Sequence, residues 1–263
     1  MARPVIALLT DFGTRDHYAG TMKGVALSIC PDITFVDISH DVPPHDVVAG
    51  ALELAAAYRY FPAGTVFLVV VDPGVGSARR GIAVEAGEYR FVAPDNGVLT
   101  PTLDLHPPRR IVELSERKYA RPTVSRTFEG RDRFAPAAAW LAKGIDLTAL
   151  GRSAGAIHRL ELPQPRVDAT AIIGEVVRVD RFGNLITNID RRMFETLAQH
   201  GVEIQAGDHR ISQVVSTYAD APAGDVCALF GSTDHLEIAA NGASAAERLA
   251  LGRGAPVQVV RRA

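Results

Sequence analysis

Short apolar runs alternate with stretches of helical spacing over the first 160 residues of the chain. Near-continuous apolar runs are typical of strands that are covered on both faces. Such runs predict strands at Val5–Leu9, Ile33–Ser39 and Thr65–Val71, and two further runs predict a hairpin at 81–94. Helical spacing predicts helices at Thr21–Cys30, Asp46–Tyr60 and Ala137–Gly144. Strands that alternate with helices indicate a layered α/β sheet.

The pattern changes at Leu160–Asp168, where two prolines suggest a linker. Beyond it, short β-like runs predict strands at 171–180, 184–190, 213–219, 236–241 and 256–262, and helical spacing is confined to Arg191–His200 and Ala245–Leu251. We therefore expect an N-terminal α/β domain with a central sheet over 1–160, a linker over 161–169 and a smaller, mostly β C-terminal domain over 170–263.

Polar residues follow the three predicted strands of the first domain at the point where each strand ends. Asp11 follows the first, Ser39-His40-Asp41 ends the second, and Asp72 follows the third. In open α/β sheets, ligands bind outside the carboxyl ends of the strands. A single aspartate there is most simply a turn or helix cap. Three polar strand ends together favour a binding cleft at this edge.

Composition and charge limit the classes of function. The chain has 263 residues, is 47% hydrophobic and 22% charged, and carries a net charge of −2. This balance is that of a globular protein and argues against binding to nucleic acid or to an anionic membrane. The two cysteines, Cys30 and Cys227, fit neither a metal pattern nor a disulfide framework, which favours a cytoplasmic protein. We expect neither a signal peptide nor a membrane span.

Several common catalytic motifs are excluded. The Asp-Phe-Gly string at Asp11–Gly13 lacks the other protein-kinase signatures. The chain has no Gly-x-Ser-x-Gly elbow and no phosphate-binding GxxxxGK[ST] loop. Its histidines are scattered without the spacing of a ligand pair, so we expect no metal site.

Four loops carry candidate chemistry, each beside a simpler structural explanation. Val69–Gly81 holds Asp72 and Arg79 among turn-forming residues, and is otherwise a tight turn with a surface arginine. Thr127–Pro136 packs alternating charges between two phenylalanines, and these charges either pair with one another or serve a site. Val179–Asp190 is either a hairpin corner with a core phenylalanine or a place where Phe182 stacks on a flat ring. Gly231–Ser244 predicts a strand whose Asn241-Gly242 exposes backbone groups to a neighbour or a ligand.

Together these segments resemble a known family. VIALLTDFGTRDHYAGTMKG, VDISHDVPPHDV, VVVDPGVGSARRGIAVE, VAPDNGVLT, FEGRDRFAPAAA, RVDRFGNLITNI and LEIAANGASAAE, in this order, resemble the S-adenosyl-L-methionine hydroxide adenosyltransferases. These adenosyl-forming hydrolases are related to the fluorinase and the chlorinase. The resemblance implies a C-terminal β-barrel domain and a homotrimer, with substrate held between one subunit's N-terminal domain and its neighbour's C-terminal domain. It implies no metal and no second cofactor.

The resemblance also implies roles for individual residues. Asp11 would accept both ribose hydroxyls, since a carboxylate offers two acceptor oxygens to a vicinal diol. The other implied contacts are Asp16 and Asp180 to the methionine ammonium, Ser232 to its carboxylate, Phe182 and Asn184 to adenine, and the backbone from Ala240 to Gly242 to the adenine edge.

The implied reaction is attack of water or hydroxide on the ribose 5′ carbon. The hydrolase branch uses an Asp–Arg–His set, of which Asp72 and Arg79 match the first two members. The third departs from the family: where the family usually reads Phe-His-Gly-Arg-Asp, this chain has Glu129 in place of His. Glu129 either accepts a proton from water, as His would, or pairs with Arg79, or weakens catalysis.

The sequence thus leads us to expect a cytoplasmic enzyme that hydrolyses S-adenosyl-L-methionine to adenosine and L-methionine. One alternative is a halide-dependent transferase that makes 5′-halo-5′-deoxyadenosine, which an acid at position 72 disfavours. The other is a non-catalytic protein that binds adenosine or S-adenosylmethionine, which the presence of Glu129 keeps open.

Overall fold

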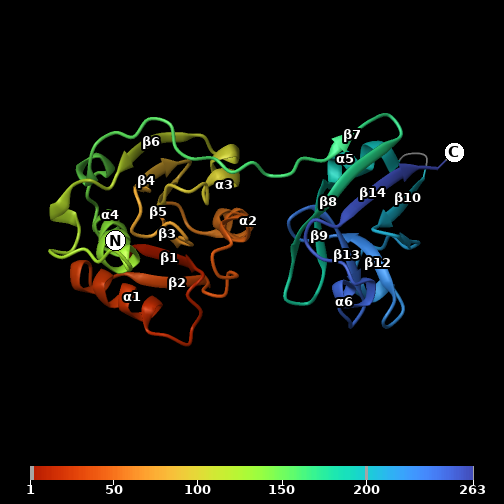
Figure 1. Cartoon of the computed structure of the whole chain (residues 1–263), viewed down its shortest axis with the longest axis horizontal. Helices are drawn as coiled ribbons and strands as arrows, with labels where there is room; N and C mark the ends of the chain where they lie inside the picture. Colours follow the sequence, from red (N-terminus) through yellow and green to blue (C-terminus); the bar gives the residue numbers. More distant parts are fainter. Residues whose placement is uncertain (1–2, 199–200, 263) are drawn as a thin grey trace. The chain divides into compact units, whose positions relative to one another are not determined.

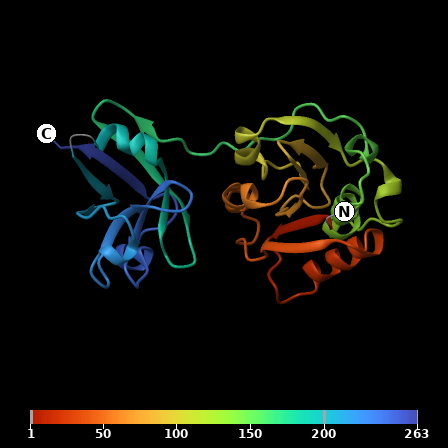
Figure 2. The ribbon, with the colours of Figure 1, turned by 180° about the vertical axis from the view of Figure 1, so that it is seen from behind.

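The structure is a computed structural model that describes residues 3–198 and 201–262. The chain forms two compact units that divide between Glu161 and Leu162 (Figures 1 and 2). The N-terminal unit is an α/β domain. The C-terminal unit is an antiparallel sheet that is nearly barrel-shaped. The expected fold class is therefore confirmed for both units.

A six-stranded sheet forms the centre of the N-terminal unit, in the order β2-β1-β3-β5-β4-β6. Its strands are β1 (Val5–Thr10), β2 (Thr34–Ser39), β3 (Val66–Val70), β4 (Gly81–Ala86), β5 (Tyr89–Pro94) and β6 (Pro108–Glu113). Strands β1, β2, β3 and β5 are parallel, whereas β4 runs antiparallel to both of its neighbours. The short β4–β5 connection explains the reversal, because a tight hairpin can join only antiparallel strands. The predicted strands and hairpin are confirmed.

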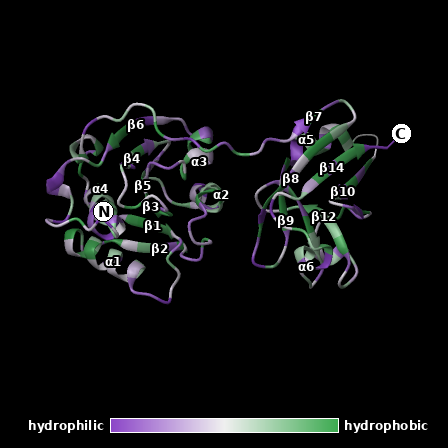
Figure 3. Cartoon of the chain, in the orientation of Figure 1, coloured by the Kyte–Doolittle hydropathy of each residue, from purple (hydrophilic) through white to green (hydrophobic). Residues whose placement is uncertain are grey.

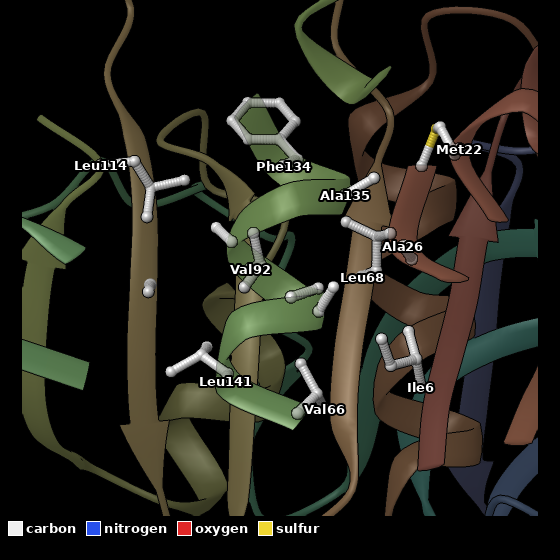
Figure 4. Packing of buried hydrophobic residues seen from close by; sticks show 14 of the residues in the cluster. Ile6, Met22, Ala26, Val66, Leu68, Val92, Leu114, Phe134, Ala135 and Leu141 are labelled. Atoms are coloured by element: carbon white, nitrogen blue, oxygen red, sulfur yellow. The ribbon is translucent and has the colours of Figure 1, made fainter. Parts of the chain in front are cut away.

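Helices cover both faces of this sheet. Helices α1 (Tyr18–Ile29) and α4 (Ala135–Ala142) pack on one face, where Ile6 of β1 and Leu68 of β3 point. Figure 4 shows the labelled side chains of this core meeting between strands and helices. Helices α2 (Val47–Ala57) and α3 (Thr100–Leu105) pack on the other face, with alternate strand residues such as Leu9. Burial on both faces is why these strands read as unbroken apolar runs.

The predicted helices are confirmed with shifted ends. Helix α2 begins after Asp46, whose side chain accepts the amide N–H of Ala49, and continues as a 3₁₀ turn at Tyr58–Tyr60. Helix α4 follows directly on a π-helix at Gly130–Phe134. Two more 3₁₀ turns lie at Arg117–Tyr119 and Leu147–Leu150.

The C-terminal unit is built on strands in the order β11-β10-β14-β8-β9-β13-β12, with β7 paired to β8. These are β7 (Arg166–Val167), β8 (Ala171–Val179), β9 (Leu185–Asp190), β10 (Val202–Ala206), β11 (His209–Ile211), β12 (Val226–Phe230), β13 (His235–Ala240) and β14 (Pro256–Arg261). A bridge between Val214 and Ala228 brings the segment after β11 to β12, which nearly closes the sheet. Figure 3 shows how apolar residues gather on the strands and polar ones in the turns.

One predicted strand of this unit is wrong. The segment 213–219 pairs only through the bridge at Val214 and then forms a 3₁₀ turn at Tyr218–Asp220. The cause is local: the Asp220 carboxylate accepts the amide N–H groups of Ser216 and Thr217 and so begins the 3₁₀ turn, which prevents a strand from continuing there.

The helices of the C-terminal unit are short. Helix α5 covers Arg191–Ala198, and the last two residues of the helix predicted for Arg191–His200 lie outside the described residues. Helix α6 covers Ala245–Leu249, where a predicted helix extends to Leu251; Ala250 adopts a left-handed conformation that ends it. Strands β7, β10, β11 and β12 were not predicted, because their short runs carry little periodicity; β7 lies within the stretch predicted as a linker.

Candidate functional site

The polar strand ends of the N-terminal unit meet at one edge of the sheet, as the sequence predicts. Strand β1 lies between β2 and β3 and is parallel to both. Residues that follow these strands therefore emerge side by side. Asp11 follows β1, His40 follows β2 and Asp72 comes two residues after β3.

Asp72, Arg79 and Glu129 form one buried cluster at this edge. A single guanidinium nitrogen, Nη2 of Arg79, lies 2.5 Å from Oδ2 of Asp72 and 2.5 Å from Oε2 of Glu129. The three side chains are 5%, 8% and 11% exposed for Asp72, Arg79 and Glu129. Two carboxylates thus share one cation, away from bulk water. The arginine is not a surface residue of a turn.

Local turns bring these residues together. After Asp72 the chain turns through bonds from Ser77 to the carbonyl of Gly74, and Oγ of Ser77 in turn accepts the amide of Arg79. Gly76 has a φ of 77°, and a Cβ there would lie 2.2 Å from the carbonyl oxygen of Arg126. Only glycine permits this approach of the two loops. The same approach brings Glu129, three residues further, to Arg79.

The electrostatics of the cluster are unusual. Burial raises the pKa of Asp72, the charge of Glu129 raises it further, and Arg79 opposes both. Oδ1 of Asp72 and Nε of Arg79 are buried without a hydrogen-bond partner. Such orphaned polar atoms are costly and call for a polar partner. The cluster therefore keeps one carboxylate oxygen and one N–H donor that no other group of the described chain satisfies.

The charged residues of Thr127–Pro136 form two separate sets of ion pairs. Arg131 pairs with its neighbour Asp132, which is fully buried and also accepts the amide of Ser125. Glu129 instead turns to Arg79, with Arg133 lying 3.6 Å from its other oxygen. Mutual pairing thus explains part of this segment, and Glu129 belongs to the cluster.

Asp11 and Asp16, the other two site residues predicted in this unit, differ in burial. Asp11 is half-buried, and its Oδ2 accepts the backbone N–H of His45 at 2.8 Å. Asp16 is exposed in the turn before α1. The structure thus holds the Asp11 carboxylate in place from the backbone.

In the C-terminal unit, Asp180, Phe182 and Asn184 form the corner between β8 and β9. Oδ1 of Asp180 accepts the amides of Phe182 and Asn184, and Oδ2 accepts the side-chain amide of Asn184. This is an Asx-type turn in which the carboxylate fixes its own loop. Asn184 is buried, whereas Phe182 is 77% exposed. The corner therefore displays a flat aromatic ring on a rigid support.

A second turn packs against this corner. A Cβ on Gly183 would lie 2.1 Å from Oγ of Ser244, and the carbonyl of Gly183 accepts the amide of Ala246. The turn that leaves β13 at Ala240 thus lies beside the corner, with Gly242 in a left-handed conformation and open space above it. Ser232 lies in the turn that enters β13, at the other end of the strand. The structure does not bring Ser232 to this corner.

Sequence reasoning missed three polar features. His45 supports Asp11 from a left-handed backbone with a φ of 68°. His40 and Thr10 form a buried hydrogen-bonded pair. In the C-terminal unit, Glu237 is buried on β13, and Tyr218 donates to it at 3.0 Å; burial and the nearby Glu237 raise the pKa of Tyr218 to about 12. The two prolines before His45 could have predicted a rigid turn there. A single histidine or glutamate within a strand pattern gives no comparable signal of a buried hydrogen bond.

Metal clusters and membrane-spanning helices are both absent from the described part of the chain. Among residues 3–198 and 201–262, no group of three or more histidine, cysteine, aspartate or glutamate side chains is placed to hold a metal ion. Within the same ranges, no helix has the length and apolar character needed to cross a membrane.

The fold and the site define a two-unit protein whose α/β unit presents a buried, charged cluster at the carboxyl edge of its sheet. Its sequence matches the model of the SAM hydroxide adenosyltransferase N-terminal domain over residues 6–151 and that of the C-terminal domain over residues 174–258. The chain belongs to the SAM hydroxide adenosyltransferase family, in which SAM stands for S-adenosyl-L-methionine.

Individual relatives cover nearly the whole chain. An (R)-S-adenosyl-L-methionine hydrolase of Thermus thermophilus is 40% identical over 98% of this chain and 100% of its own length. A fluorinase of an Actinoplanes species is 32% identical, with 98% of each chain covered. Among solved structures, an uncharacterized conserved protein from Thermotoga maritima matches with a TM-score of 0.92 and 36% identity, over 97% of this chain and all of the other.

Proposed function

We propose that the protein hydrolyses S-adenosyl-L-methionine to adenosine and L-methionine. The observation that carries the proposal is the buried cluster of Asp72, Arg79 and Glu129, whose unpartnered atoms suit a water molecule. Water or hydroxide forms a C–O bond at the ribose 5′ carbon. The C5′–S bond breaks with its electron pair on sulfur, and methionine leaves as a neutral thioether. One proton of the water is released.

In this proposal each member of the cluster has a task. The unpartnered Oδ1 of Asp72 and Nε of Arg79 orient the water, one as acceptor and one as donor. Glu129 takes the position that histidine has in the family and receives the proton of the water. Arg79 holds both carboxylates at 2.5 Å and so keeps two negative charges together in a buried place.

The sulfonium group of the substrate is itself a good leaving group. A sulfonium loses its positive charge as the C5′–S bond breaks, so a dry site favours the transition state over the charged ground state. The reaction as proposed uses no metal and no second cofactor.

The remaining residues would bind the substrate. Asp11 would accept the ribose hydroxyls, Asp16 and Asp180 the ammonium, and Ser232 the carboxylate of the methionine part. Phe182, Asn184 and the backbone from Ala240 to Gly242 would hold adenine. An exposed aromatic ring on a rigid corner supports the stacking role. The bonds that Asp180 makes to its own turn leave one lone-pair direction on Oδ2 for an ammonium.

We further propose a homotrimer in the cytoplasm, with each substrate between the N-terminal unit of one subunit and the C-terminal unit of its neighbour. The proposal rests on the family resemblance, and the two free, buried cysteines suit a reducing compartment. Light scattering of the purified protein tests the trimer.

A halide-dependent transferase is the second candidate, because relatives named fluorinase are 31–32% identical to this chain. The cluster opposes it. Asp72 and Glu129 place two carboxylates around one guanidinium, so the buried group has no surplus positive charge for an anion. Water, which is neutral and both donates and accepts, suits the cluster better.

The test is incubation with each sulfonium epimer of S-adenosylmethionine in halide-free buffer, with oxygen-18 water and chromatography of the products. The relatives' name leads us to expect turnover of the (R) epimer. Adenosine that carries oxygen-18 at the 5′ position, in equal amount to methionine, is the expected result. Product that appears only with chloride would support the transferase. Tight adenosine binding by calorimetry without any turnover would support a non-catalytic binder.

A further inference from the structure

A buried polar pair lies beneath the turn that carries Asp11, apart from the Asp72 cluster. Oγ1 of Thr10 lies 2.8 Å from Nδ1 of His40. Thr10 is completely buried and His40 is 6% exposed. His40 is the only buried histidine among the residues that the structure describes. Polar groups are placed in a core at a cost, so this pair calls for a reason.

The surroundings of His40 favour one direction for its hydrogen bonds. Its Nε2 lies 3.1 Å from Oδ1 of Asp37, although not aligned for a hydrogen bond, and Lys23 binds the other oxygen of Asp37 at 2.6 Å. A carboxylate beside Nε2 favours the tautomer with hydrogen on that nitrogen. Nδ1 is then an acceptor, and the Thr10 hydroxyl donates to it. The Thr10 oxygen remains free to accept the amide of Phe12 at 3.3 Å.

The segment that begins at His40 also holds the turn at Asp11 through its backbone groups. The amide of Gly13 donates to the carbonyl of His40 at 2.7 Å. Five residues after His40, the amide of His45 donates to the Asp11 carboxylate from a left-handed conformation that is uncommon for residues other than glycine. The turn at Asp11 is thus fixed at Thr10, at its own carboxylate and at Gly13, and His40 makes two of these three bonds.

We infer that His40 is a positioning residue that fixes the Thr10–Gly13 turn, so that the Asp11 carboxylate is held ready for the vicinal diol of a nucleoside. The inference rests on the ribose-binding role of Asp11 in the proposed function. It assigns His40 no contact with the substrate. A carboxylate must be held in one orientation to accept two neighbouring hydroxyls, which is what three bonds on a four-residue turn provide.

The test is adenosine affinity by calorimetry, together with thermal unfolding. His40→Leu removes the acceptor and should weaken adenosine binding about tenfold, as loss of roughly one well-placed hydrogen bond would. His40→Asn places an oxygen near the position of Nδ1 and should restore affinity to within a few-fold of the wild type. Thr10→Val removes the same bond from the other side, and keeps the test available if His40→Leu fails to fold.

Thr65→Val is the matched control. Thr65 is equally buried and donates to the carbonyl of Pro62 at 2.8 Å, but it lies where β3 begins, at the opposite edge of the sheet. It should lower the unfolding temperature and leave adenosine affinity unchanged. If Thr10→Val and Thr65→Val both lower only the unfolding temperature, His40 has a structural role alone and the inference is overturned.

A double mutant tests whether His40 acts through Asp11. Asp11→Asn should cost less affinity in the His40→Leu background than in the wild type, because the carboxylate is no longer held. Full additivity would overturn the inference. An Asp11→Asn variant with wild-type affinity would overturn it too, while the hydrolysis, scored separately by its products, would stand.

Discussion

The two units present their candidate site residues in opposite ways. In the N-terminal unit, Asp72 and Arg79 of one loop meet Glu129 of a distant segment in a buried cluster with unpartnered atoms. In the C-terminal unit, the corner at 180–184 satisfies its own carboxylate and displays Phe182 to solvent. The first arrangement holds two buried carboxylates close together and raises the pKa of Asp72, and such shifts are common in catalytic sites. The second is locally satisfied, as a recognition surface can be. Substitutions should therefore separate turnover from affinity.

Arg79→Ala should produce the largest effect and would most directly test this division. Without Arg79, Asp72 and Glu129 face each other with no shared cation, and the water loses a donor. Turnover of S-adenosylmethionine should fall by about 100-fold or more, as on removal of one preorganised donor. Adenosine affinity should change little. Steady-state kinetics and calorimetry measure the two.

Arg133→Ala is the control for Arg79→Ala. Arg133 also approaches Glu129, but at 3.6 Å and with 32% of its side chain exposed. Partly exposed pairs contribute about 0–1 kcal/mol, so this variant should keep most of its activity. If Arg79→Ala lowers affinity and turnover equally, Arg79 does not belong to the water-orienting group.

Asp11→Asn comes next and concerns affinity in the N-terminal unit. The substitution replaces charge-assisted hydrogen bonds to the ribose by neutral ones, at a cost on the order of 1.5–3 kcal/mol of binding free energy. Calorimetry with adenosine measures it. Unchanged affinity would remove Asp11 from the site and would leave nucleoside binding to the C-terminal unit.

Phe182→Ala should have a smaller effect, on affinity alone. Stacking on an aromatic ring contributes roughly 1 kcal/mol, so adenosine should bind about fivefold more weakly. Because the ring is 77% exposed, the free energy of unfolding should stay within about 0.5 kcal/mol of the wild type. A large loss of stability would show that Phe182 is part of a core or an interface and not only a stacking surface.

The smallest effect should be on how the free energy of unfolding depends on pH. Burial raises the pKa of Asp72. The positive charge of Arg79 lowers it, and the negative charge of Glu129 raises it further. A raised carboxyl pKa gives stability that is complete below the unfolded-state pKa and is lost as the pH rises through the folded-state value. Relative to Asp72→Asn, the wild type should therefore become less stable as the pH rises across the acidic range. The loss should be about 1.4 kcal/mol for each tenfold difference between the acid dissociation constants of the folded and unfolded states.

Urea unfolding of the wild type and of Asp72→Asn at several pH values measures this loss. A difference in unfolding free energy that stays constant with pH would contradict a raised pKa at Asp72.

Much of the N-terminal unit could be predicted because its strands are covered on both faces. The run at Thr65–Val71 and the helical spacing near Asp46 survive in β3 and α2 with small shifts of their ends. The C-terminal unit was harder. Its strands are short, and in the segment 213–219 the Asp220 carboxylate overrides a β-like composition. Local hydrogen bonds of this kind leave no trace in the pattern of apolar residues.

By itself, the sequence determined which residue types were available at the carboxyl ends of the strands, because strand periodicity and chain order place Asp11 and Asp72 there. It also determined the corner at 180–184, whose bonds all lie within five residues. Only the tertiary structure decided that Glu129 reaches Arg79, fifty positions away, and that His40 lies beneath Thr10. The physical reason is that these contacts depend on two loops packing at Gly76 and on the register of β1 against β2, which sequence spacing does not encode.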